Sequence, residues 1–317
     1  MKSEMAYKFK GAGHEEPERK REYTKVDSQL AAEFEKWLTI AGPNKDSKKD
    51  EAKKKEFFAE VFGRLKKMPT VTELHALLIK YQDRPYIDLY APDFLNKFYN
   101  HIDEKVILYD IDAGENFCYL GQALASEKVL INKEKSGYEF GHSAKGTIIN
   151  YADEEVGSSM GILLEGKFLN YGNVSEKLAE KSCYTSLCIN AGSSEHLGLT
   201  TLGVVINFGK AKQFGEDAMS DSILINAGDV EVFGKGSTGH LISLKDPTKY
   251  DAGSGIILNA ERCKEIPKLQ KYFDALRKKV EAGRTDYKAA IKLMKTLSRE
   301  KIESDLERII TGAGQAW

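Results

Sequence analysis

The sequence of 317 residues predicts a multidomain α+β protein, in which a central right-handed parallel β-helix is flanked by helical domains. Two observations predict the β-helix: an aliphatic-Asn pair recurs every 16 to 20 residues, and an apolar-Gly pair recurs between these pairs. A third observation, the helical spacing of apolar residues before and after this region, predicts the flanking helices. A short repeat cannot bury its apolar face alone, so evenly spaced repeats indicate a stack of coils.

The aliphatic-Asn pair marks one position in each repeat. Ile242-Ser243 fills the one gap in the series, and Gly or Ala usually stands two residues after the Asn. Runs such as Val204-Val205-Ile206 precede each Asn and are typical of strands buried in a parallel stack. If each Asn occupies the same corner of its coil, the amides form a ladder between coils. The predicted ladder residues are Asn132, Asn150, Asn170, Asn190, Asn207, Asn226 and Asn259.

The apolar-Gly pair marks a second corner, as in Phe140-Gly141 and Phe214-Gly215. Asn and Gly both tolerate the positive φ that sharp corners require. One repeat is therefore interpreted as two short strands joined by an Asn-x-Gly turn and followed by an apolar-Gly corner. We expect seven or eight such coils over residues 106–262. The strict six-residue period of left-handed β-helices is missing, which favours a right-handed coil.

This repeat resembles the glycine-rich β-helix of glutamate synthase carboxy-terminal domains and of their relatives among formylmethanofuran dehydrogenase subunits. The resemblance covers residues 114–260 and is one of repeat style. Those relatives act as structural spacers, so the resemblance implies a structural role and transfers no catalytic residue. Bactofilins, which are polymer-forming β-helices, are also similar in outline, although their repeats carry no Asn ladder.

The remaining chain divides into three segments. Residues 1–22 are polar and charged, and we expect a mobile tail. Residues 23–105 predict a small domain of four helices, the third of which begins at a capping box, Thr70-x-x-Glu73. Residues 263–317 predict two helices, the second running from Tyr287 to Leu306. Because the ends of a solenoid expose unpaired strand edges, we expect both helical domains to act as caps.

Charge is distributed unevenly between these segments. Residues 108–246 carry 19 Asp and Glu against 11 Lys and no Arg, whereas residues 261–301 carry 13 Lys and Arg against 6 acids. Lysines at helical spacing are candidate contacts for phosphates, and lysine suits charge-based contact better than base readout. Solvated helix faces are the alternative interpretation. The candidates are Lys48, Lys49, Lys53, Lys54, Lys55, Lys268, Lys271, Lys278, Lys279, Lys288, Lys292 and Lys295.

The sequence contains no motif that identifies a catalytic, metal or cofactor site. Walker A, dinucleotide and nucleophile-elbow patterns are missing, and the six histidines and four cysteines show no metal-ligand spacing. We therefore predict no catalytic residue, no metal and no cofactor. The acidic cluster Asp153-Glu154-Glu155, with Asp217, Asp221 and Asp229 farther along, leaves a carbohydrate-active β-helix enzyme as an alternative.

These observations favour a non-enzymatic scaffold that binds a macromolecular partner, or itself, through its helical ends and charged faces. A ribosome- or RNA-associated factor that docks through its basic helices is the second expectation. The chain has no run of 18 apolar residues and no apolar signal segment at its start, so we expect a cytoplasmic protein without membrane insertion.

Overall fold

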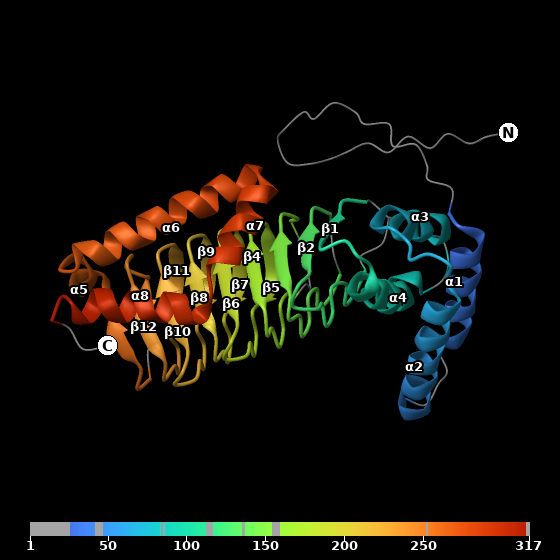
Figure 1. Cartoon of the computed structure of the whole chain (residues 1–317). Coiled ribbons are helices and arrows are strands. Elements are labelled where there is room, and N and C mark those ends of the chain that lie inside the picture. Colours follow the sequence, from blue (N-terminus) through green and yellow to red (C-terminus); the bar gives the residue numbers. More distant parts are fainter. Residues whose placement is uncertain are drawn as a thin grey trace.

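A computed structural model describes residues 26–41, 47–82, 84, 86–111, 117–134, 137–153, 159–251 and 253–314. The molecule is elongated, with a parallel β-solenoid between a group of four helices at one end and four helices that follow the last strand (Figure 1). The predicted α+β fold with a central parallel β-solenoid is confirmed. Among the described helices, none is both long enough and apolar enough to cross a bilayer.

The solenoid contains two parallel sheets. In the larger sheet, each strand pairs in register with the equivalent strand of the next coil, so that Asn190, Asn207 and Asn226 are aligned. Its nine strands, in spatial order, are β1 (Val106–Tyr109), β2 (Val129–Asn132), β3 (Thr147–Asn150), β4 (Lys167–Asn170), β6 (Leu187–Asn190), β8 (Val204–Asn207), β10 (Ile223–Asn226), β12 (His240–Ser243) and β14 (Ile256–Leu258). The second sheet contains β5 (Asn173–Leu178), β7 (Ser193–Leu197), β9 (Lys210–Phe214), β11 (Asp229–Phe233) and β13 (Lys249–Tyr250).

Both faces of the nine-stranded sheet are buried. In β8, Val205 belongs to the core inside the solenoid, whereas Val204 and Ile206 belong to a second core that includes the C-terminal helices. Each strand places alternate residues on opposite faces, so a sheet covered on both sides needs continuous aliphatic runs. This explains why the strands of this sheet show no alternation of apolar and polar residues.

Two kinds of glycine shape the coil. Gly215, in an apolar-Gly corner, has a φ of +75°, where a side chain would be strained. Gly209, two residues after a ladder Asn, is required because a Cβ atom there would lie 1.9 Å from the carbonyl oxygen of Gly192 on the preceding coil. Among the described residues, no Asn has a positive φ. The positive φ expected at both corners is therefore confirmed for the glycine of the apolar-Gly pair and wrong for the ladder asparagines.

The Asn ladder is present over six of the seven predicted residues. The Nδ2 atom of each Asn donates to Oδ1 of the next Asn at 2.8–3.2 Å, from Asn132 to Asn226. Asn226 continues the column to the hydroxyl of Ser243 at 3.3 Å. Asn259 does not belong to this column, because its side chain accepts a hydrogen bond from the backbone of Arg262 and caps the next helix.

The four N-terminal helices are α1 (Ser28–Ala41), α2 (Ser47–Arg64), α3 (Val71–Tyr81) and α4 (Ile87–His101). Their core is aromatic and continuous with the solenoid interior, since Trp37, Phe94 and Phe168 belong to one buried cluster. The predicted capping box is present at the start of α3, where the side chains of Thr70 and Glu73 each bond to the other's backbone nitrogen.

Helix α4 replaces a missing coil at the β1 end of the solenoid. The Asn96 side chain donates to the carbonyl of Tyr119 at 2.8 Å and accepts from the Gly121 nitrogen at 2.7 Å. One turn later, Asn100 bonds in the same way to Ala123 and Ala125. The amides thus satisfy backbone groups that a preceding coil would otherwise satisfy, which is the function of a cap.

Replacing Asn96 with alanine is expected to lower the free energy of unfolding by about 1–2 kcal/mol, because the buried Gly121 nitrogen would lose its partner. Urea denaturation would measure this. Lys97→Ala, an exposed change on the same helix, is the control and is expected to change stability by less than about 0.5 kcal/mol. Equal effects of the two substitutions would contradict the capping role of Asn96.

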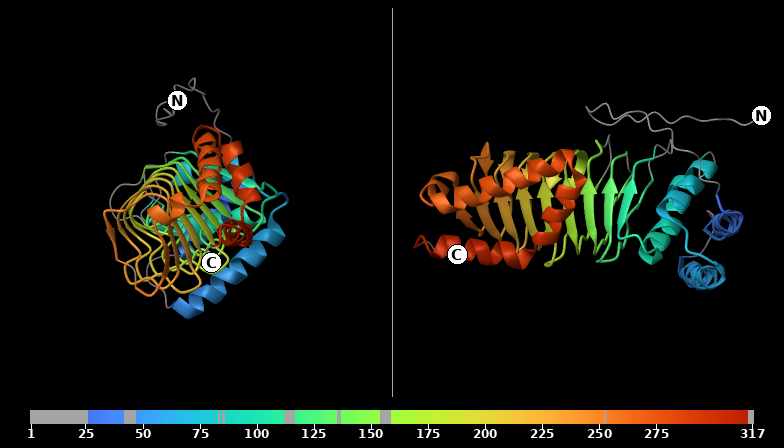
Figure 2. Two further views of the ribbon diagram at one scale, coloured as in Figure 1. Left: turned by 90° about the vertical axis from the view of Figure 1, so that its left-hand side faces the viewer. Right: turned by 45° about the horizontal axis from the view of Figure 1, so that its top comes forward.

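The C-terminal helices are α5 (Ala260–Lys264), α6 (Pro267–Thr285), α7 (Tyr287–Thr296) and α8 (Arg299–Thr311). They were expected to cover the far end of the solenoid, but α6, α7 and α8 lie along its side, over the outer face of the nine-stranded sheet (Figures 1 and 2). The single helix expected from Tyr287 to Leu306 is also interrupted. Ser298 caps a new helix by accepting from the Lys301 nitrogen, which separates α7 from α8.

Candidate functional site

The helical layer formed by α6, α7 and α8 is attached to the solenoid by arginines that bind backbone carbonyls. Arg299 is 2 % exposed and donates to the carbonyls of Tyr184, Leu202 and Asp221 at 2.5–3.0 Å. These three residues lie just before β6, β8 and β10. One guanidinium therefore joins three successive coils, and its planar group also lies 3.5 Å from the centre of the Tyr184 ring.

Helix α6 is attached along the row of residues that directly follow the ladder asparagines. Arg284 donates to the carbonyl of Ala191 at 2.7 Å and stacks on the Tyr171 ring. Arg277 donates to the carbonyl of Ala227 and stacks on Phe208. Two arginines of α6 therefore bond to carbonyls that directly follow ladder asparagines, two coils apart.

Tyrosines of the solenoid make the reciprocal contacts. The hydroxyls of Tyr151 and Tyr171 donate to the α6 carbonyls of Gly283 and Val280 at 2.5 and 2.7 Å. Burial raises the pKa of both phenols, so they stay protonated and remain donors. Gly283 must be glycine here, since a Cβ atom would lie 2.2 Å from the Tyr171 hydroxyl. These contacts fix the position of α6 on the coils.

The helices attached in this way expose seven of the twelve candidate lysines to solvent on their outer surface. All seven are exposed, and none forms an ion pair with a carboxylate of the described residues. We call this surface the lysine face; it consists of Lys268, Lys271, Lys278 and Lys279 on α6 and Lys288, Lys292 and Lys295 on α7.

Helical geometry explains why these lysines gather. The α7 lysines follow one another at four- and three-residue steps, and so they occupy one side of the helix, opposite the buried Ala290, Leu293 and Met294. On α6 the acidic residues are engaged elsewhere: Asp274 accepts from Gln270, and Glu281 pairs with Arg284 at 3.2 Å. Residues 267–296 hold nine Lys and Arg against three Asp and Glu, so this layer is strongly basic.

The lysines of α2 form a separate group beyond the β1 end of the solenoid, far from α6 (Figure 1). Lys53 and Lys55 are exposed. Lys54 is not available in the same way, because it pairs with Asp93 at 2.9 Å and lies over the Trp37 ring. Lys48 and Lys49 belong to α2, but their side chains lie outside the described part of the structure.

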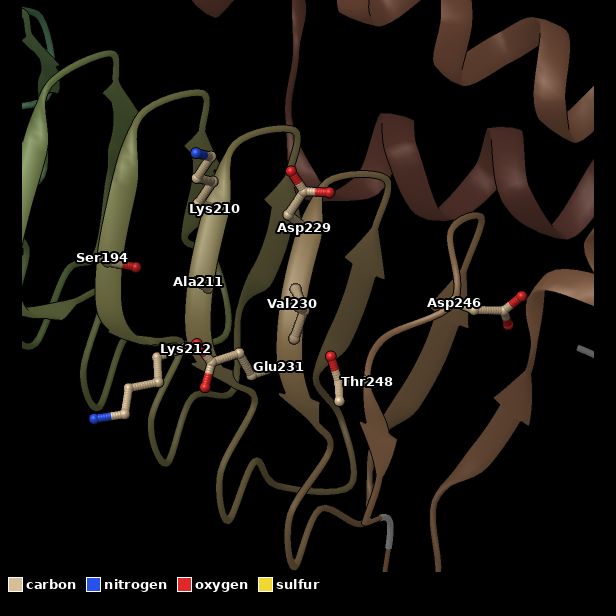
Figure 3. A pocket seen from close by; sticks show the side chains of 9 residues that line it. All are labelled: Ser194, Lys210, Ala211, Lys212, Asp229, Val230, Glu231, Asp246 and Thr248. Atoms are coloured by element: carbon tan, nitrogen blue, oxygen red, sulfur yellow. The ribbon is translucent and has the colours of Figure 1, made fainter.

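The second sheet leaves its outer face uncovered by helices. A shallow depression of about 320 Å³ lies on it, with Ser194, Ala211 and Val230 among its lining residues and charged side chains of β9 and β11 along its edges (Figure 3). Lys212 pairs with Glu195 on the neighbouring coil at 2.7 Å, which holds the pKa of that exposed carboxyl below its usual value. Because charged side chains of neighbouring coils pair with each other, this face is a solvated surface whose charges are neutralised within the protein.

The acidic residues considered for carbohydrate chemistry do not converge. Asp153 accepts from the backbone and side chain of Asn173, whereas Glu154 and Glu155 lie outside the described residues. Asp229 pairs with Lys245, and the Asp221 carbonyl binds Arg299. Of the considered acids that the structure describes, Asp229 alone lines the depression on the second sheet.

The histidines of the solenoid have separate local partners. His142 contacts Glu139 at 2.6 Å and His196 lies 3.5 Å from Glu216, while burial lowers the pKa of His240 beneath α8. Within the described ranges, no three His, Cys, Asp or Glu side chains are placed to hold a metal ion. The attachment roles of Arg277, Arg284 and Arg299 were not predicted from the sequence.

Comparison of this chain with protein-family models, with curated proteins and with solved structures finds no match. The resemblance to the glutamate synthase and formylmethanofuran dehydrogenase repeats therefore stays a prediction. Any statement of function depends on the geometry described above.

Proposed function

We propose that this protein is a non-enzymatic scaffold, a stiff rod that holds helical surfaces for macromolecular partners at fixed positions. The observation that supports this most is the attachment of the C-terminal helices. Arg299 alone bonds to three coils, and the α6 contacts extend over coils from Tyr151 to Ala227. A helical layer held at so many points moves with the solenoid as one body.

The N-terminal helices are joined to the same body by different contacts. Asn96 and Asn100 bond to the first coil, and the aromatic core of α1 to α4 continues into the solenoid interior. The lysines of α2 and the lysine face are therefore carried at a constant separation along the rod. This arrangement suits a protein whose partners must be kept apart or aligned, since both helical groups are fixed to one packed solenoid.

Pulsed electron spin resonance on a doubly labelled protein tests the scaffold. Labels would be attached at Lys53→Cys and Lys268→Cys, with the half-buried Cys118 and Cys183 changed to serine. We expect one narrow distance population, as wide as that of a control pair on α6 alone, Lys268→Cys and Lys279→Cys. A broad or multiple distribution for the long pair, with a narrow control, would contradict a rod that fixes its helical surfaces.

A further inference from the structure

We propose that the lysine face binds the phosphate backbone of single-stranded RNA without reading its sequence. The inference rests on the proposed function for one premise, that the surface serves a macromolecule and not a small substrate. Its seven lysines project from α6 and α7, whose arginines, Arg277 and Arg284, donate to carbonyls of the solenoid. The unpaired outward charge of these two helices is thus carried by lysine, which contacts phosphates as a point charge and lacks the planar group used for base recognition.

The charge of this surface is not neutralised within the molecule. Other lysines of the chain have carboxylate partners, as in Lys212 with Glu195 and Lys301 with Asp305. The lysines of the lysine face have none among the described residues, although the solenoid beneath them is acidic overall. Anions from the solvent must therefore neutralise these lysines, and the release of those anions favours the binding of a polyanion.

The lack of exposed large apolar side chains on this surface favours a nucleic acid over a membrane or a protein as its partner. A membrane-binding helix places large apolar side chains beside its lysines, and a protein interface centres on aromatic or aliphatic anchors. The exposed large apolar residues of the described chain are Tyr86, Leu89, Val106, Tyr138, Leu163, Tyr184 and Met219, and none lies on α6 or α7. A partner recognised by charge alone, through a continuous line of phosphates, fits this surface best.

The dimensions also suit a nucleic acid strand. From Lys268 to Lys279 the α6 lysines extend over about 16 Å, and from Lys288 to Lys295 the α7 lysines extend over about 10 Å, at 1.5 Å per residue. The two helices pack against each other, so the two groups of lysines lie on adjoining helices. Several consecutive phosphates of one strand can contact rows of lysines of these lengths.

Fluorescence anisotropy with a labelled 20-nucleotide single-stranded RNA of mixed sequence tests the inference. Over about 50 to 200 mM salt, a plot of log K against log salt should fall with a slope of about −3 to −5, as expected for about five to seven contacts at −0.7 each. The variant K271Q/K278Q/K288Q/K292Q should bind roughly 100-fold more weakly at low salt, and its slope should become shallower by about 3.

The chain offers a matched control at its other end. K288Q/K292Q should weaken binding roughly tenfold, whereas K53Q/K55Q, which removes two exposed lysines from α2, should change it less than about twofold. Circular dichroism and the melting temperature of each variant would verify folding. The inference is overturned by no binding at about 50 mM salt, by equal losses in the two double variants, or by tighter binding to polyglutamate or phosphatidylserine vesicles. These results would leave the distance measurement, and hence the scaffold, unaffected.

Discussion

Replacing Arg299 with alanine is expected to lower the free energy of unfolding by about 3–5 kcal/mol. Its guanidinium is almost fully buried and donates to carbonyls of three coils, with Glu303 at 3.4 Å as its nearest carboxylate. Without it, three carbonyls would lose a charged donor and the start of α8 would lose its attachment. Chemical denaturation followed by circular dichroism measures the change.

Two companion variants make this result specific. Arg299→Lys should recover less than half of the loss, since an ammonium group cannot place donors on three carbonyls and lie flat on Tyr184. Arg308→Ala removes an arginine of the same helix that is 75 % exposed and pairs only with Asp305, so it should cost less than about 0.5 kcal/mol. A similar loss for Arg308→Ala would show that α8 is stabilised mainly by its own helix contacts.

Replacing Asn207 with leucine is expected to cost about 2–4 kcal/mol. Asn207 is fully buried, accepts from Asn190 at 2.9 Å and donates to Asn226 at 3.2 Å. Leucine would leave a buried amide N–H of Asn190 without its acceptor, at about 1–3 kcal/mol, and would reduce Asn226 Oδ1 to one donor, the Gly228 nitrogen. Thermal melting is a simple measurement, and a fall of several degrees is expected.

Asn173→Leu is the control for the ladder. Asn173 begins β5 and is exposed, and its amide bonds to Asp153 at the surface. This substitution adds the same side chain without leaving a buried polar group unpaired, so we expect a change below about 1 kcal/mol. If both asparagines proved equally tolerant of leucine, the hydrogen-bonded column would not contribute to stability as described.

The repeat spacing was enough to predict the solenoid and most of the ladder, because both are periodic in sequence as well as in space. Leu258-Asn259 has the same letters as the true ladder pairs, but its Asn caps α5. Letters alone cannot separate these roles, since an amide at the end of a strand can bond to the next coil or to the first turn of a helix.

The place of the C-terminal helices was not predicted, although the sequence held a signal for it. Continuous aliphatic runs such as Val204-Val205-Ile206 imply that both faces of the sheet are covered, and helices that flank the solenoid in sequence were available to cover the outer face. The identity of the attachment points was beyond sequence reasoning, because the contacts of Arg284 and Arg299 join residues 78 to 115 positions apart.

The lysine surfaces, too, could be predicted from the sequence only in part. Helical spacing predicted that the lysines of α7 would share one side, because local geometry determines it. It did not show that the lysines of α6 and α7 lie on adjoining helices, or that Lys54 pairs with Asp93. Such groupings depend on how the helices pack against each other, which the spacing of residues along one helix does not determine.

Native-state hydrogen exchange, read by mass spectrometry, tests the central claim that the helical layer and the coils form one body. Peptides from α6 and α8 should exchange only with the global unfolding of β8 and β10, because the arginine and tyrosine contacts prevent separate opening. If α6 and α8 exchanged much faster than those strands, the helices would be shown to detach on their own, and the account of a rod that holds its surfaces in place would be wrong.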